Sequence, residues 1–145
     1  MSTIFGVFRR DGRPVEPDDL LSMGRAVTFL GSVPAAYWRG TEIGLGVCRR
    51  HPEDSWSDPQ PLQDATTGIT ISAHVRLDNR GELCDQLGIA ADGQTDTELI
   101  LAAYLKWGEE FVPRLLGDWA IAIWDSRSRK LLLSRDHHGM TPMFY

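Results

Sequence analysis

The sequence predicts an α+β sandwich, and two observations lead to that prediction. Candidate strands occupy both ends of the chain and candidate helices lie between them, which favours separate strand and helix layers over a repeating βα pattern. In addition, residues 119–124 are apolar at every position, so this strand belongs to a sheet that is covered on both sides. With 145 residues, the chain is long enough for one domain with a sizeable core.

Composition and charge narrow the classes of function. The formal net charge of −5 argues against nucleic acid or an anionic membrane as the main partner. No apolar run reaches the roughly 18 residues of a membrane-spanning helix, and no signal peptide is recognisable. Cys48 and Cys84 lack the spacing and density of a disulfide scaffold, so we expect both to be buried apolar side chains in a protein of the reducing cytoplasm.

The N-terminus combines a predicted strand with a candidate nucleophile. Residues 4–8 are apolar, β-branched or aromatic, which predicts a buried strand that fixes the N-terminus inside the fold. Because the residue after Met1 is small, aminopeptidase trimming is expected to expose Ser2 as the N-terminal residue. A hydroxyl beside a fixed α-amine is the geometry of an N-terminal nucleophile, in which the amine is the general base.

The next fifty residues predict a helix, two strands and a loop. After a turn at residues 9–13, Pro17 marks the first turn of a helix and Gly31 its end. The apolar face of this helix is formed by Leu20, Leu21, Val27 and Leu30. Two strands follow at residues 35–39 and 42–48, and then a polar, proline-containing loop at residues 51–63.

Strict alternation predicts a half-buried strand at Ile69–Leu77. One face carries the apolar side chains of Ile69, Ile71, Ala73, Val75 and Leu77, and the other carries Thr70, Ser72, His74 and Arg76. Candidate capping boxes at residues 79–82 and 95–98 then open two helices, which end near Gly88 and Trp107. The last elements are a helical turn and the two strands of a hairpin, at residues 109–116, 119–124 and 130–134.

Six stretches of the chain, in one order, resemble a known domain family. They are STIFGVF, GLGVCRR, QPL, HVRLDNRGEL, TDTELILAAYLKWGEEFVPRLLGDWAIAIWD and LLLSRDHHGMTPMFY. Together they resemble the N-terminal glutamine amidotransferase domain of the asparagine synthetase family, which includes β-lactam synthetases and lasso peptide cyclases. The resemblance covers nearly the whole chain. It implies a four-layer αββα fold of the N-terminal nucleophile hydrolase type, with two mainly antiparallel sheets.

The resemblance also implies a role within a larger enzyme. In active members, a cysteine after Met attacks the side-chain amide of glutamine, and the released ammonia passes to a C-terminal ATP-pyrophosphatase domain that forms an amide. We therefore expect residues 1–145 to be a single domain at the N-terminus of a longer chain, with the synthetase domain as its partner in cis. A separate synthetase chain in trans and a homodimer stay open as alternatives.

The positions of the family's catalytic residues indicate a degenerate glutaminase site. The nucleophile position holds Ser2, and the oxyanion-hole Asn-Gly of active members is replaced by His74-Val75. A hydroxyl needs a well-placed base, and losing one oxyanion donor typically costs about 100- to 1,000-fold in turnover. We expect the Val75 side chain to crowd the pocket. The family's His-Arg-Gly-Pro-Asp stretch has no counterpart around residues 30–36.

Two positions match residues that hold glutamine in active members. Arg49 matches the arginine on the glutamine carboxylate, and Asp96 matches the acid on its α-amine. A structural role is an equal alternative for each, since an acid in the first turn of a helix is favoured by the helix dipole alone. An amino-acid-binding module that uses Arg49 and Asp96 stays open, as does an amidohydrolase in which Ser2 attacks and His74 donates to the oxyanion.

The leading prediction is a scaffold and interface without glutaminase activity. The resemblance includes β-lactam synthetases and many lasso cyclases, which have lost the same activity because their amine is intramolecular. The chain contains neither GxxxxGK[ST] nor the Ser-Gly-Gly-x-Asp-Ser loop of the synthetase domain, so we expect ATP and Mg²⁺ only in that domain.

The remaining candidates are predicted to be structural. His137-His138 are adjacent, which makes a poor metal pair, and they are expected in the turn before Pro142; we expect no metal site in this domain. Arg135-Asp136 matches a family pair that we interpret as a buried ion pair or a turn brace. Trp119 and Trp124 are predicted to lie in the core.

Overall fold

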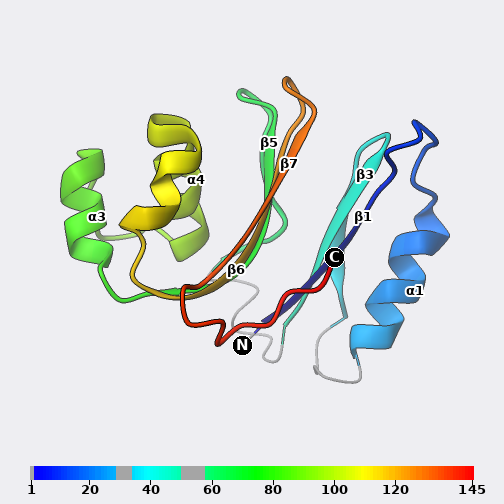
Figure 1. The fold of residues 1–145 in the computed structure, drawn as a ribbon, viewed down its shortest axis with the longest axis horizontal. Coiled ribbons are helices and arrows are strands. Elements are labelled where there is room, and N and C mark those ends of the chain that lie inside the picture. The colour runs from blue at the N-terminus through cyan, green and yellow to red at the C-terminus, as the bar shows by residue number, and fades with distance from the viewer. Residues whose placement is uncertain (1, 29–33, 50–57) are drawn as a thin grey trace.

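The computed structural model describes residues 2–28, 34–49 and 58–145, and its layers confirm the predicted sandwich. Two antiparallel sheets face each other (Figure 1). Helix α1 (Pro17–Thr28) covers the outer face of one sheet, and helices α3 (Arg80–Leu87) and α4 (Asp96–Trp107) cover the outer face of the other. The order of layers is therefore helix, sheet, sheet, helix, as the resemblance implied.

The first sheet has the strand order β1-β3-β2, with β1 at Ser2–Phe8, β2 at Ala36–Arg39 and β3 at Ile43–Arg49. The prediction that residues 4–8 form a buried strand is only half right. Within the described residues β1 pairs with β3 alone, so it is an edge strand with partly exposed side chains. The predicted contributions of Leu30 and Gly31 to α1 lie outside the described residues.

Two glycines of β3 allow close packing on the α1 side of this sheet. A Cβ on Gly46 would lie 2.2 Å from Cζ of Phe5, and one on Gly44 would lie 2.6 Å from Cδ1 of Leu20. Real Cβ atoms essentially never come this close, so a side chain at either position would force Phe5 or Leu20 to move.

The second sheet has the order β4-β5-β6-β7. Its strands are Leu62–Asp64, Ile69–Leu77, Gly117–Asp125 and Lys130–Arg135. The prediction of a loop at residues 51–63 is wrong at its end, because Leu62 pairs with Ile71; residues 51–57 lie outside the described part. β4 has three residues, of which only Leu62 is apolar, so it is too short for a periodic pattern to be recognised.

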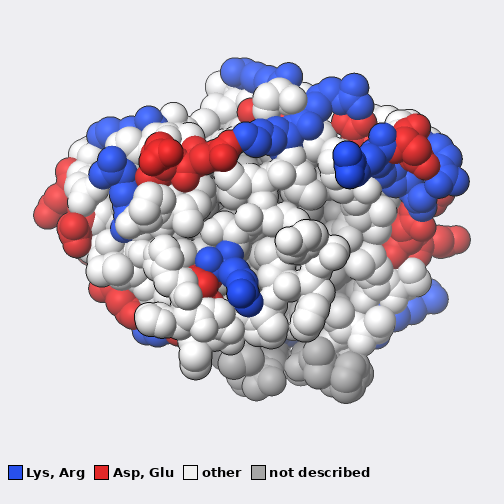
Figure 2. Space-filling model, viewed as in Figure 1, with Lys and Arg blue, Asp and Glu red and all other residues white. Residues whose placement is uncertain are grey.

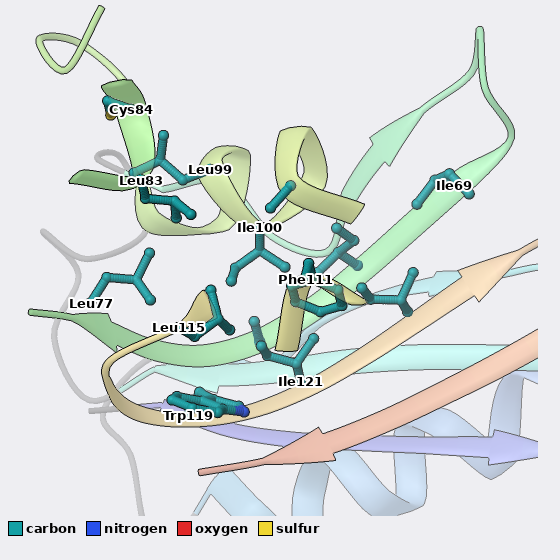
Figure 3. Packing of buried hydrophobic residues seen from close by; sticks show 14 residues of the cluster. Ile69, Leu77, Leu83, Cys84, Leu99, Ile100, Phe111, Leu115, Trp119 and Ile121 are labelled. Atoms are coloured by element: carbon teal, nitrogen blue, oxygen red, sulfur yellow. The ribbon is translucent and has the colours of Figure 1, made fainter. Parts of the chain in front are cut away.

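The larger core lies between the second sheet and its helices, including the 3-10 helix η1 (Gly108–Arg114) (Figure 3). Its fully buried members include Ile71, Leu99, Ile100, Phe111, Leu115, Trp119, Ile121 and Ile123. A smaller core between the two sheets contains Ile43, Leu45, Ala122 and Trp124. Alternate residues of β6 thus enter opposite cores, which confirms that this sheet is covered on both sides.

Only one of the two predicted capping boxes forms. Thr95 Oγ1 accepts from the Glu98 N–H at 3.1 Å, and Glu98 Oε2 accepts from the Thr95 N–H at 2.7 Å. Asn79 makes no such cap: its side chain donates to the Arg114 carbonyl at 2.9 Å and accepts from the Leu116 N–H at 3.0 Å. Because these partners are more than thirty residues away, the local pattern could not reveal them.

The polar face of β5 meets the other sheet rather than solvent, so the prediction of a half-buried strand is wrong. Thr70 and Ser72 are buried, and Ser72 Oγ donates to the Gly46 carbonyl of β3 at 2.8 Å. Alternation separates the two faces but does not say what covers each one. His74 shares this face and therefore points toward the first sheet.

Candidate functional site

Ser2 and His74 meet where the beginning of β1 lies against β5. The backbone nitrogen of Ser2 donates to His74 Nδ1 at 3.1 Å. Because Nδ1 accepts this bond, a neutral His74 ring carries its proton on Nε2. Burial lowers the pKa of His74, the positive charge of the N-terminus lowers it further, and Asp118 opposes both. Burial and the N-terminal charge thus disfavour the protonated form of the ring beside the candidate nucleophile.

Arg49 is the direct cross-strand neighbour of Ser2. The two residues are paired in the β1–β3 register, so their side chains share the face that points toward the second sheet. Arg49 is buried, and its guanidinium donates to the backbone carbonyl of Asp58. Its Nη2 also lies 3.7 Å from Asp58 Oδ2. The predicted carboxylate-holding residue therefore already has a carboxylate partner within the chain.

Asp58 is held in turn by two further polar side chains. Gln60 Nε2 donates to Asp58 Oδ2 at 2.7 Å, and Thr97 Oγ1 donates to the same oxygen at 2.9 Å. Gln60 Nε2 also lies 2.8 Å from Thr97 Oγ1, and Gln60 Oε1 accepts from the Ala73 N–H at 2.7 Å. This polar network links the end of β3 to β5 and to the first turn of α4.

Sequence reasoning did not identify the members of this polar network other than Arg49. Gln60 was present only as part of the QPL stretch, and Thr97 only inside a capping motif. No local signal places Thr97 against Asp58, because thirty-nine residues separate them.

Asp96, the predicted amine-holding residue, is also paired within the chain. Its Oδ2 accepts from the Leu77 N–H at 3.0 Å, and its Oδ1 forms an ion pair with Arg80. Asp96 thereby fastens the N-terminal turn of α4 to the end of β5. Since Thr97 is the next residue, the Arg49 and Asp96 positions are neighbours through the polar network.

Val75 does not crowd the pocket, which corrects the prediction. Its side chain packs against the core beneath the helices, on the face of β5 opposite to His74. The N–H groups of Ala73 and Leu77 bond to Gln60 and Asp96, away from β6, so by alternation the Val75 N–H points to the same edge. A backbone donor thus remains at that edge, although the side chain is not glycine.

A mostly apolar cavity of about 920 Å³ lies between the sheets on the β1 and β7 side. Ser2 and His74 line it, whereas Arg49, Val75 and Asp96 do not. Its apolar lining includes Ile4, Phe8, Leu131, Leu133, Met140 and Phe144. The structure therefore separates the Ser2–His74 contact, which faces the cavity, from the polar network behind it.

The turn after β7 confirms that Asp136 is a brace rather than half of an ion pair. Burial would raise the pKa of Asp136, but N–H donors led by Thr141 and Met140, each 2.9 Å away, hold it below its ordinary value. His137 lies in the same turn, edge-on to Trp119 at 5.3 Å. No ion pair of Asp136 occurs within the described residues.

The other residues that the sequence analysis singled out lie in the core or do not belong to a cluster of metal-ligating side chains within the described residues. Cys48, Cys84, Trp119 and Trp124 are each at most 4% exposed, as predicted. Across residues 2–28, 34–49 and 58–145, no three His, Cys, Asp or Glu side chains gather as a metal site would require. In the same residues, no helix is long and apolar enough to cross a membrane.

Comparison with known proteins points to one family. Residues 1–145 match the family described as "Glutamine amidotransferase domain". Asparagine synthetase [glutamine-hydrolyzing] 3 of Bacillus subtilis is 41% identical over 113 residues, which cover 74% of this chain and 18% of that protein. Asparagine synthetase [glutamine-hydrolyzing] 1 of the same organism is 28% identical over 153 residues, covering 100% of this chain and 24% of the relative.

A third relative has a different name. The amidase chyE of Penicillium rubens is 31% identical over 106 residues, which cover 71% of this chain and 16% of that protein. The chain thus spans less than a quarter of the length of each of these three relatives.

Proposed function

Because this chain belongs to the N-terminal glutamine amidotransferase domain of the asparagine synthetase family, we propose that it supports amide synthesis without hydrolysing glutamine. It acts as scaffold and interface for an ATP-dependent, amide-forming synthetase domain, in cis or in a separate chain. ATP and Mg²⁺ bind to that domain rather than to this one. The synthetase domain also determines whether the product is asparagine, a β-lactam or a lasso peptide.

The observation that carries the loss of glutaminase activity is the internal pairing of both glutamine-holding positions. Arg49 is occupied by Asp58, and Asp96 is occupied by Arg80 and the Leu77 N–H. A glutamine would have to displace these contacts before its amide could approach Ser2. Ser2 itself is a weaker nucleophile than cysteine, and its backbone nitrogen is engaged by His74.

Exposed apolar side chains support the role as an interface. Met140 and Phe144 are 72% and 93% exposed, and both line the cavity between the sheets. Figure 2 shows few charged side chains in the middle of the face over which, in Figure 1, β7 and the C-terminal segment run, whereas charges gather at its rim. Exposed apolar side chains on a surface with few charges are typical of a protein–protein contact.

A glutaminase assay tests the proposal. We expect the purified domain to release no glutamate from glutamine, either alone or with its synthetase partner present. Ser2→Cys should not restore activity, because Arg49 and Asp96 remain paired in that variant. Enzyme-dependent glutamate release that Ser2→Ala abolishes would contradict the proposal.

One observation favours a second candidate, an amidohydrolase with Ser2 as nucleophile. If Met1 is removed, the nitrogen that now donates to His74 Nδ1 becomes an α-amine, and the imidazole is placed to accept a proton from it. Ser2 Oγ would attack an amide carbonyl and pass its proton to the α-amine, which gives it to the leaving nitrogen as the amide C–N bond breaks. Water would then hydrolyse the acyl-enzyme ester, releasing the carboxylic acid and regenerating the Ser2 hydroxyl. The relative named amidase chyE is compatible with this candidate.

Intact mass measurement decides first between the two candidates. A retained Met1 leaves Ser2 without an α-amine and rules the amidohydrolase out. If Met1 is absent, an electrophilic amide or lactone probe should label Ser2 in the wild type and leave the Ser2→Ala protein unlabelled.

A further inference from the structure

We propose that the Asp58 carboxylate pairs with Arg49 in place of a substrate carboxylate and thereby prevents an α-amino acid from binding to this domain. The inference rests on the proposed function, in which Arg49 is the position for a substrate carboxylate. It goes further by identifying a side chain that pairs with Arg49 and so opposes the binding of an α-amino acid there.

The contacts of Arg49 match what a carboxylate ligand would provide. Its guanidinium donates to the Asp58 carbonyl, while the Asp58 carboxylate lies 3.7 Å from Nη2. The Arg49 side chain is only 7% exposed, and Asp58 contacts its guanidinium through both its carbonyl and its carboxylate. A second carboxylate at the same guanidinium would also be repelled by Asp58, strongly so at low local dielectric.

The polar network holds Asp58 in this position. Thr97 and Gln60 both donate to Asp58 Oδ2, and Gln60 is itself fixed by the Ala73 N–H of β5. Thr97 is fully buried in the first turn of α4, so its hydroxyl has few alternative orientations. Two donors, from α4 and from Gln60, therefore converge on the Asp58 carboxylate, while Arg49 of β3 adds its positive charge at 3.7 Å and donates to the Asp58 backbone carbonyl.

The ammonium position is closed in a similar way. Asp96 neutralises Arg80 and accepts from the Leu77 N–H, so both charges that would receive an α-amino acid are satisfied internally. The two carboxylates are similarly exposed, at 20% for Asp96 and 23% for Asp58, but the Arg80 side chain is 35% exposed and that of Arg49 only 7%. Asp58 is for this reason the more restrictive of the two contacts.

Removing the Asp58 carboxylate should open the position to small carboxylates. In Asp58→Ala, Arg49 keeps the backbone carbonyl of residue 58 but loses this carboxylate, while the Thr97 and Gln60 donors stay, which leaves room for acetate or the α-carboxylate of glutamine. Because charge-assisted hydrogen bonds are the strong ones, we expect the affinity for L-glutamine to rise at least about tenfold over the wild type.

NMR titration with L-glutamine, and separately with acetate, tests the inference. We expect no saturable shifts in the wild type at millimolar ligand, and saturable shifts in Asp58→Ala and, more weakly, in Asp58→Asn. Adding Arg49→Gln to Asp58→Ala should remove the gain. Asp85→Ala, which removes an exposed acid of α3, is the matched control and should behave as the wild type.

The guanidinium signals of Arg49 in the wild type provide a readout that needs no folded variant. Glutamine that shifts these signals in the wild-type protein would overturn the inference, as would folded Asp58 variants that gain no affinity. Wild-type glutamate release with unchanged Arg49 signals would instead contradict the proposed function alone. Glutamine binding at Arg49 without glutamate release would contradict the inference alone.

Discussion

At the scale of single residues, His74 contacts Ser2 at the start of the chain, and its surroundings there lower its pKa. The imidazole accepts a backbone N–H and lies in a partly buried space, so its protonated form is disfavoured. A serine that takes part in such a contact is held in place by β1, whether or not it performs chemistry. Position and reactivity are therefore separate properties of Ser2.

The stability of the protein should depend on the ionisation of His74. Because the pKa of His74 is lowered by folding, the unfolded chain binds the proton more readily, and the free energy of unfolding falls as the pH drops below 6.5. His74→Asn keeps an acceptor for the Ser2 N–H but cannot titrate, so its urea midpoint should change less between neutral pH and the region below 6.5. His138→Asn, at an exposed histidine, should retain the wild-type pH dependence.

At the scale of secondary-structure elements, the N-terminus of α4 is fixed by a local hydrogen-bond pair. Thr95→Ala removes the acceptor for the Glu98 N–H and should lower the free energy of unfolding by about 1 kcal/mol. Thr95→Ser keeps the hydroxyl and should lose much less. Equal urea midpoints for Thr95→Ala and the wild type would show that the capping box contributes nothing to stability.

Phe5 packs directly on Gly46 of β3, which has no side chain. Gly46→Ala would place a Cβ against the Phe5 ring, and we expect a loss of about 1–3 kcal/mol in the free energy of unfolding. Gly81→Ala, at an exposed position of helix α3, is the control. A Cβ at this position would meet no atom of a neighbouring element within 4 Å, so the substitution should raise the free energy of unfolding by about 0.5–1 kcal/mol. In a Phe5→Leu background the cost of Gly46→Ala should shrink, as a double-mutant cycle would measure.

At the scale of the whole molecule, the β1 and β7 edge of the sandwich offers a partner a different surface from the two outer faces. This edge carries the cavity and the exposed side chains of Met140 and Phe144, whereas α1 covers one outer face and α3 and α4 cover the other. The proposed scaffold role requires that the partner binds on the apolar side.

Substitution of the exposed apolar residues tests that requirement. Phe144→Ala and Met140→Ala should change the free energy of unfolding of the isolated domain by less than about 0.5 kcal/mol, because both side chains are largely exposed. Both should weaken binding to the synthetase partner in a calorimetric titration. Leu105→Ala, at an exposed leucine of α4, is the matched control, and a larger loss of binding in that variant would place the interface elsewhere.

The sequence by itself determined most elements of this fold, since local patterns carry them. Alternation located β5, a capping motif located α4, and the all-apolar segment of β6 required a sheet covered on both sides. The order of motifs was sufficient to identify the family. Each of these signals depends on residues within about a dozen positions of one another, where backbone geometry fixes the spacing of side chains.

Only the tertiary structure decided which contacts the site residues make. In the folded chain, His74 accepts a hydrogen bond from the Ser2 N–H, the Val75 side chain packs in the opposite core, and Arg49 pairs with the Asp58 carboxylate. These outcomes depend on which layer covers each face of a strand and on hydrogen bonds between residues far apart in the chain. A pattern of apolar and polar residues along one strand does not contain that information, because it leaves both the covering layer and the distant partner undetermined.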